Sequence, residues 1–225
     1  MGVTAAMAFR IPKSCRYSFS IDLKAGTVLA MAAAMVAISG VVLRKSLDAP
    51  AWVIIIVQSI QTGSMLLAPA WAGAAIGRRK AVLISNGAIA SGILLLTTAL
   101  TVPAVNYFFP GLKRFSFFGA TPDILLFAAM LIMVYFSTAG FLALMAAVYR
   151  QNYPASLRAQ ILSRANVWKL IAGQSMLIAA NFTLDRKQDA FVYWLVMGAI
   201  FYIMGGLIYS RMHVLGEMTL PRGIN

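Results

Sequence analysis

Charged side chains are scarce in this chain. Only 11% of its 225 residues are Asp, Glu, Lys or Arg, whereas 61% are hydrophobic. A soluble domain has about 25% charged residues, so a water-soluble fold would leave too much apolar surface uncovered. The apolar runs also lack the alternation of apolar and polar residues that is typical of membrane β-barrel strands. The composition therefore predicts an all-α polytopic membrane protein.

Groups that could perform chemistry are few as well. The chain has six acidic residues, one histidine and one cysteine. We expect all six acidic residues at the ends of membrane spans or outside them. We find no metal-binding pattern, catalytic triad or phosphate-binding loop, and Cys15 alone can form neither an internal disulfide nor a cysteine metal cage. The sequence therefore predicts neither an enzyme nor a cofactor or metal.

What the chain does have is long apolar segments. The first, residues 25–43, reaches roughly 29 Å as a helix, which is enough for a hydrocarbon layer of about 30 Å. We predict six transmembrane helices in residues 25–210, between a cytoplasmic or interfacial lead (1–24) and a cytoplasmic tail (211–225). The six predicted spans are 25–43, 51–71, 81–104, 123–148, 166–184 and 190–210. The fifth is the least apolar of them, because it contains Lys169, Gln174 and Asn181.

The cations indicate an orientation. With six spans, twelve Lys and Arg residues lie on the side of the two termini and six on the other side. Positive residues accumulate in the cytoplasm, so both termini are predicted to be cytoplasmic and the protein to lie in a cell's inner (plasma) membrane. The net charge of +13 is spread over helix ends, so it indicates helix orientation and contact with the lipid bilayer rather than nucleic-acid binding.

Polar side chains within the spans are candidate cavity-lining residues. Gln58, Gln61 and Thr62 fall on one helical face of the second span, and a Gln in hydrocarbon needs a partner. This face should therefore point into the bundle, either to hydrogen bond between helices or to line a polar cavity. The full candidate set is Gln58, Gln61, Thr62, Tyr135, Thr138, Gln174 and Asn181. Lys169 has two interpretations: it can extend to the lipid head groups, which we favour, or face a cavity and meet an anionic solute.

Small residues at spacings of four predict close helix contacts, since helices in lipid associate where their backbones approach. In the third span, Gly87 and Ser91, and Ala88 and Gly92, are four residues apart. The sixth span has Gly198 with Gly205 and Gly206, which follow seven and eight residues later.

Three stretches carry a resemblance to a known family. Gly77, followed by the cations Arg78, Arg79 and Lys80, resembles the end of the signature loop between spans two and three of major facilitator superfamily transporters. Ala70, Ala74 and Ala75 stand where that loop has Gly, Asp and a basic residue. "IDLKAGTVLA" (21–30) and "YRQNYPASLRAQILSR" (149–164) resemble the entry into span one and the loop after span four in a bacterial branch of the superfamily.

The resemblance covers about residues 20–212 and implies the N-terminal six-helix half of such a transporter, with a 3+3 repeat of helices. It implies transport of a small solute, with the missing half supplied by a homodimer or a second membrane chain, and it makes Gly77–Lys80 a candidate gate or topology loop. Two alternatives stay open: a membrane scaffold or assembly factor that does not transport, and a truncated transporter fragment.

Overall fold

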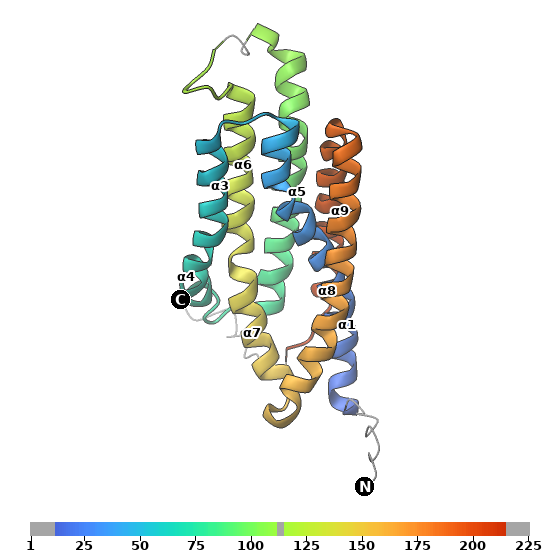
Figure 1. Ribbon diagram of the computed structural model, residues 1–225. Helices are drawn as coiled ribbons and strands as arrows, with labels where there is room; N and C mark the ends of the chain where they lie inside the picture. The colour runs from blue at the N-terminus through green and yellow to red at the C-terminus, as the bar shows by residue number, and fades with distance from the viewer. Residues whose placement is uncertain (1–11, 112–114, 215–225) are drawn as a thin grey trace.

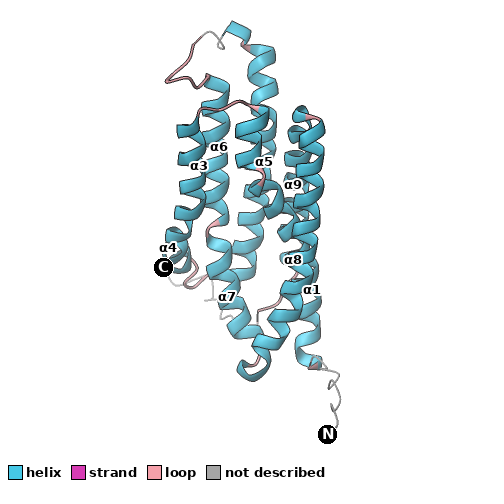
Figure 2. Ribbon diagram, viewed as in Figure 1, coloured by secondary structure: helices cyan, strands magenta, loops and turns pink. Residues whose placement is uncertain are grey.

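The computed structural model describes residues 12–111 and 115–214 (Figure 1). Almost all of these residues lie in helices, and the described ranges contain no strand (Figure 2). The α-helices are α1 (Lys13–Ala37), α2 (Ser39–Val41), α3 (Ala51–Gly63), α4 (Ala68–Ala74), α5 (Lys80–Phe108), α6 (Pro122–Thr138), α7 (Gly140–Asn152), α8 (Ala155–Arg186) and α9 (Phe191–Tyr209). Short π and 3-10 turns, η1 (Val42–Ser46), η2 (Ser64–Leu67) and η4 (Gln188–Ala190), join some of them.

Five helical stretches in the described ranges are long and apolar enough to cross a membrane. They are Cys15–Ser46, Ala51–Ala74, Lys80–Phe108, Pro122–Asn152 and Gln188–Tyr209. The helix that contains the predicted fifth span, α8, has 32 residues but is not one of the five, because Lys169, Gln174 and Asn181 lower its hydropathy. The structure therefore shows a helical membrane-type protein with five such stretches, whereas six spans and a 3+3 repeat stay predictions.

Several boundaries differ from those expected. Helix α1 begins at Lys13, so much of the 1–24 segment that we expected outside the span continues it as one helix. Helix α8 begins at Ala155, eleven residues before the predicted fifth span. The predicted tail from 211 onward lies mostly outside the described residues. Both early starts follow a proline, Pro12 or Pro154, which suits a helix start because it has no N–H to leave unpaired.

Three of the five stretches are interrupted inside the bundle. The first breaks at the buried residue Ile38 and ends in the π turn η1. The second changes to a 3-10 turn at Ser64–Leu67, just before Pro69, whose ring and missing N–H oppose a regular α-helix through this point. The fourth breaks between α6 and α7. The indole of Trp71, in α4, lies against Gly140 at this break, and its Nε1 donates a 3.3 Å hydrogen bond to the carbonyl of Phe136. The break in the fourth stretch is therefore filled by a side chain of the second.

Hydrogen bonds and an ion pair formed by side chains join neighbouring helix ends at the two ends of the bundle. At one end, Tyr17 donates to the Arg211 carbonyl (3.3 Å) and Asn152 to the His213 carbonyl (3.0 Å), so the start of α1 and the end of α7 lie with the end of α9. At the other end, Trp52 donates to the Phe118 carbonyl (3.0 Å), and Lys45 forms an ion pair with Asp185. All long helices run between these ends (Figure 1). We call the first the α1-start end.

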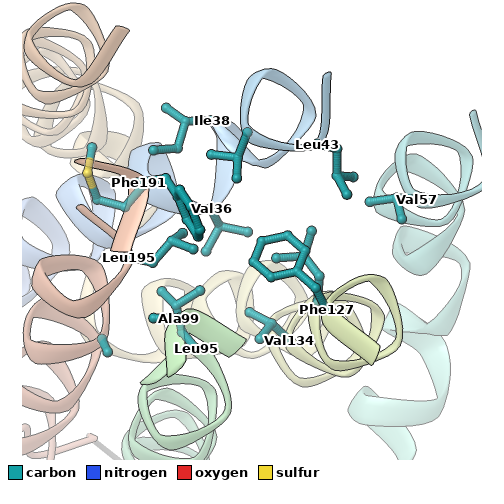
Figure 3. Packing of buried hydrophobic residues seen from close by; sticks show 14 of the residues in the cluster. Val36, Ile38, Leu43, Val57, Leu95, Ala99, Phe127, Val134, Phe191 and Leu195 are labelled. Atoms are coloured by element: carbon teal, nitrogen blue, oxygen red, sulfur yellow. The ribbon is translucent and has the colours of Figure 1, made fainter. Parts of the chain in front are cut away.

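The main core lies where α1, α5, α6 and α9 meet. It is purely hydrophobic around Phe127, Leu95 and Leu195, with Val57 reaching it from α3 (Figure 3). The small residues predicted for helix contacts lie beside it. A Cβ added at Gly92 or Gly206 would come within 2.8 Å of a backbone oxygen of the facing helix, α9 or α5 respectively. The backbones of α5 and α9 therefore approach as closely as glycine allows.

The other small residues make further contacts of this kind. A Cβ at Gly198 or Gly205 would meet Met35 or Leu29 of α1 at 2.6 and 2.7 Å, and one at Gly87 would meet Phe141 at 2.9 Å. The Ser91 hydroxyl shares a 2.8 Å hydrogen bond with Ser137 of α6. These positions join α9 to α1, and α5 to α6 and α7.

Candidate functional site

A buried ion pair joins α1 to α8 near the α1-start end. Lys169 Nζ lies 3.1 Å from Asp22 Oδ2 and 3.2 Å from Oδ1, and it also donates to the Tyr149 hydroxyl at 3.1 Å. Tyr149 in turn donates to Asp22 Oδ1 at 3.0 Å. The Asp22 side chain is 0% exposed and that of Lys169 is 13% exposed. Three helices thus contribute one side chain each to a closed hydrogen-bonded triad.

Two glycines leave the space that this ion pair occupies. Gly26 lies one turn after Asp22 on the same face of α1, and the stem of Lys169 crosses α1 directly over it. Any larger residue at 26 would collide with the Cε atom of Lys169. One turn further along, a Cβ at Gly173 of α8 would lie 3.2 Å from the Ala30 carbonyl. Two glycines therefore set the close, parallel register of α1 and α8 that brings the charges together.

The triad corrects two of our expectations. We expected Asp22 outside the spans, but α1 continues through it and buries it completely. We favoured a Lys169 that extends to the lipid head groups, but its ammonium group points into the bundle. Removing two charges from water is expensive unless they pair and hydrogen bond, and the triad supplies both conditions.

Two more tyrosines adjoin the triad. The ring of Tyr153 stacks on that of Tyr149 with centroids 5.9 Å apart. The hydroxyls of Tyr153 and Tyr209 are buried and have no hydrogen-bond partner among the described residues. Burial, and after it the nearby negative charge of Asp22, raises the pKa of the Tyr153 phenol. The triad therefore lies in a polar, tyrosine-lined pocket rather than in plain hydrocarbon.

A central hollow of about 380 Å³ adjoins the triad between α1, η2, α6 and α7. Its wall is largely apolar, with a few polar groups placed around it. The polar or charged lining residues are Gln61, Ser64, Tyr135, Thr138, Lys169 and Tyr202. The Tyr135 hydroxyl shares a 2.7 Å hydrogen bond with Ser39. An apolar hollow with a few convergent polar groups is the usual form of a small-molecule site.

A second hollow lies along the contact between α1 and α8. This open groove, of about 680 Å³, contains Asn166 and Gln174 from α8 and a row of alanines from α1. Lys169, Ala30 and Ala33 border both it and the central hollow. Lys169 is therefore the charged residue that borders both hollows.

The seven candidate cavity residues lie in different places. Gln61, Tyr135 and Thr138 border the central hollow, and Gln174 borders the groove. The amide of Gln58 lies over Gly40 of α2. Thr62 is exposed, and its hydroxyl donates to the Gln58 carbonyl of its own helix. Asn181 is half-buried and is not among the residues that line either hollow. The structure thus brings four of the seven to the two hollows.

The candidate gate loop connects α4 to α5 at the α1-start end. Gly77 adopts φ +70°, a left-handed conformation that glycine adopts without strain, and it lets the chain reverse between the two helices. Arg78 and Arg79 are exposed, and Lys80 begins α5. Its geometry is that of a tight turn between two helices at the α1-start end.

Sequence reasoning missed Asp22 and Tyr149 as site residues. The available signal was the spacing of Asp22 and Gly26, which places an acid and a gap on one helical face. In the described ranges, no group of three or more His, Cys, Asp or Glu residues is placed to hold a metal ion. The site can therefore bind and orient a polar or charged group through an amine, amides and hydroxyls.

Comparisons of the chain with protein-family models, with curated proteins and with solved structures find no match.

Proposed function

We propose that this chain forms one wall of a membrane transport pathway for a small solute, as a six-helix bundle of major facilitator type in which α8 is the fifth span. The observation that carries the proposal is the uneven distribution of polar groups on its surface. Amide side chains are exposed on α3 and α8, at the middle of the bundle, next to the two hollows. On the other described α-helices, the exposed amides are Asn86 of α5 and Gln151 of α7, and each lies near an end of its helix rather than at the middle of the bundle.

The contrast is clear between α8 and α9. Gln174 of α8 is exposed at mid-helix, whereas the exposed side chains of α9 within the span are apolar or aromatic, among them Ile200, Met204 and Leu207. A buried amide without a hydrogen-bond partner costs several kcal/mol in hydrocarbon, on the order of 4 or more. The α3–α8 face is therefore suited to water or protein, and the α9 face to lipid.

A second bundle is needed to enclose the hollows, since both are open at the surface of this one. We propose that it comes from a second copy, from a different membrane chain or from another part of a longer protein. Lys169, which borders both hollows, is the charged residue that an entering solute meets. Asp22 and Tyr149 hold that charge in place.

Two measurements test the proposal. The first is the native mass of gently solubilised protein, which we expect to equal two bundles or more. The second is uptake by proteoliposomes of a panel of labelled amino acids, carboxylates and sugars, where we expect saturable uptake of at least one. Gln61→Leu and Gln174→Leu should lower that uptake several-fold.

Thr97→Leu is the matched control. Thr97 is also an exposed polar residue, but it lies on α5 and its hydroxyl donates to the Leu94 carbonyl of its own helix. The Thr97→Leu variant should therefore leave solute uptake unchanged. A lone monomer that takes up none of the panel would contradict the proposal and favour a scaffold that does not transport.

A further inference from the structure

A third hollow lies on the other side of the α1–α8 contact and is independent of the proposed pathway. This outer groove has a volume of about 530 Å³. Leu23, Lys24, Thr27 and Val28 of α1 line one side and Trp168, Ile171 and Ala172 of α8 the other, with Ile208 of α9. Apart from Lys24 and the Thr27 hydroxyl, the lining is apolar. Trp168 and Ile171 are also more than half exposed.

The position of Lys24 along α1 places it at the level of lipid head groups. Lys24 and Arg44 are the cations on either side of the apolar run 25–43. They are twenty residues apart, so about 30 Å of helix separates them, the thickness of the hydrocarbon layer. Trp168 lines the groove beside Lys24, and tryptophan is enriched at the same interface. The groove thus begins at the head-group level and continues toward the acyl chains.

Lys24 is the uncompensated charge at this level. It is exposed and forms no hydrogen bond or ion pair with any residue in the described ranges. The neighbouring cation, Lys169, is already paired with Asp22. The mouth of the groove is therefore positive, and its interior is apolar.

We propose that the outer groove binds one anionic phospholipid, with its phosphate on Lys24 and an acyl chain along Val28 and Ile171. Charge complementarity at the mouth selects the anionic head group, and the apolar lining accepts the chain. A lysine near the membrane surface contributes an attraction worth roughly a fivefold preference for anionic over zwitterionic lipid. A zwitterionic lipid gains the same chain contacts but little from Lys24.

Tryptophan quenching tests this with the full chain in vesicles. The Trp168 signal is taken as the difference between the wild type and Trp168→Phe. We compare its quenching by brominated phosphatidylglycerol and by brominated phosphatidylcholine at equal mole fractions. We expect phosphatidylglycerol to occupy the groove about fivefold more favourably. Lys24→Gln should bring this ratio close to one.

Lys187→Gln is the matched control, because Lys187 is an exposed lysine at the opposite end of the bundle. It should keep the wild-type ratio. Equal quenching by both lipids in the wild type, or an unchanged ratio in Lys24→Gln, overturns the proposal. Quenching by neither lipid also overturns it, since protein would then cover the groove.

Native mass spectrometry provides a second measurement that needs no loss of tryptophan. The wild type and Lys187→Gln should retain one phosphatidylglycerol through mild activation, and Lys24→Gln should lose it. Ala172→Trp fills the groove without altering charge and should lose it too. Retention by both Lys24→Gln and Ala172→Trp would place the bound lipid elsewhere and contradict the proposal.

Discussion

At the scale of single residues, the Asp22 carboxylate depends on partners from distant parts of the chain. Its two partners, Tyr149 and Lys169, are 127 and 147 residues away in sequence. Because Asp22 is fully buried, no water replaces a partner that is lost. The pair is therefore more sensitive to removal of one charge than to removal of both.

We predict that Lys169→Met destabilises the protein strongly. It leaves the Asp22 charge buried with only the Tyr149 hydroxyl, and an unpaired buried charge of this kind costs about 3–5 kcal/mol. The double variant Asp22→Leu with Lys169→Met removes both charges and should recover most of the loss. Thermal unfolding of the purified protein in detergent, followed by helical circular dichroism, measures both changes.

The Lys45–Asp185 pair is the control, because its side chains are 50% and 58% exposed. Lys45→Met should cost less than about 1 kcal/mol, as exposed ion pairs do. Equal losses of stability in Lys45→Met and Lys169→Met would show that burial does not determine how much each ion pair contributes. A double variant as unstable as Lys169→Met would mean that packing around Gly26, rather than charge, sets the cost.

At the scale of helices, the glycines on facing backbones decide how closely the helices approach. Gly206 of α9 lies against Ser85 of α5, where an added Cβ would be 2.8 Å from a carbonyl oxygen and 3.0 Å from Ile89. The oxygen belongs to a buried helix backbone, so it cannot rotate away as a side chain would. The helices themselves must separate to admit a methyl group.

We predict that Gly206→Ala lowers the free energy of unfolding by about 1–3 kcal/mol, the usual cost of overpacking. Gly73→Ala is the matched control, because Gly73 lies in α4 with no atom within 4 Å of its added Cβ. It should be neutral or stabilising, since alanine is preferred over glycine within a helix. The same thermal unfolding experiment measures both variants. If Gly73→Ala lowered the free energy of unfolding as much as Gly206→Ala, the close backbone approach would not be the cause and the prediction would be wrong.

The helices also show what the sequence could and could not predict. Long apolar runs place five membrane-type stretches, because an apolar run of this length forms a helix in hydrocarbon whatever its neighbours. Spacings of four among small residues indicate where backbones approach. The interruption between α6 and α7 depends instead on Trp71 entering from another helix. The Asp22–Lys169 pair depends on the register between α1 and α8. The spacing of residues within one helix does not predict that register.

At the scale of the whole molecule, the cations divide unequally between the two ends. In the described ranges, the end opposite the α1-start end has Arg44, Lys45, Arg186 and Lys187. Near the α1-start end lie Arg16, Lys24, Arg78, Arg79, Lys80, Arg150, Arg158, Arg164 and Arg211. The opposite end also displays exposed aromatic residues, among them Tyr107, Phe117 and Phe118. Tyrosine, like tryptophan, is enriched at a membrane interface.

This asymmetry predicts that the α1-start end faces the cytoplasm, since Lys and Arg are retained on that side during insertion. Single cysteines in a Cys15→Ser background test the prediction with a membrane-impermeant maleimide. Ser116→Cys, at the opposite end, should react in intact cells. Ile76→Cys, which replaces a residue 82% exposed beside the gate loop, should react only after the cells are permeabilised.

Equal labelling of both variants in permeabilised cells is the control for accessibility. Labelling of Ile76→Cys alone in intact cells would reverse the orientation. Lys24 would then contact lipids of the outer leaflet, but its match to an anionic head group would be unchanged. The orientation therefore decides which leaflet supplies the lipid of the outer groove, whereas the lipid chemistry is decided by Lys24 itself.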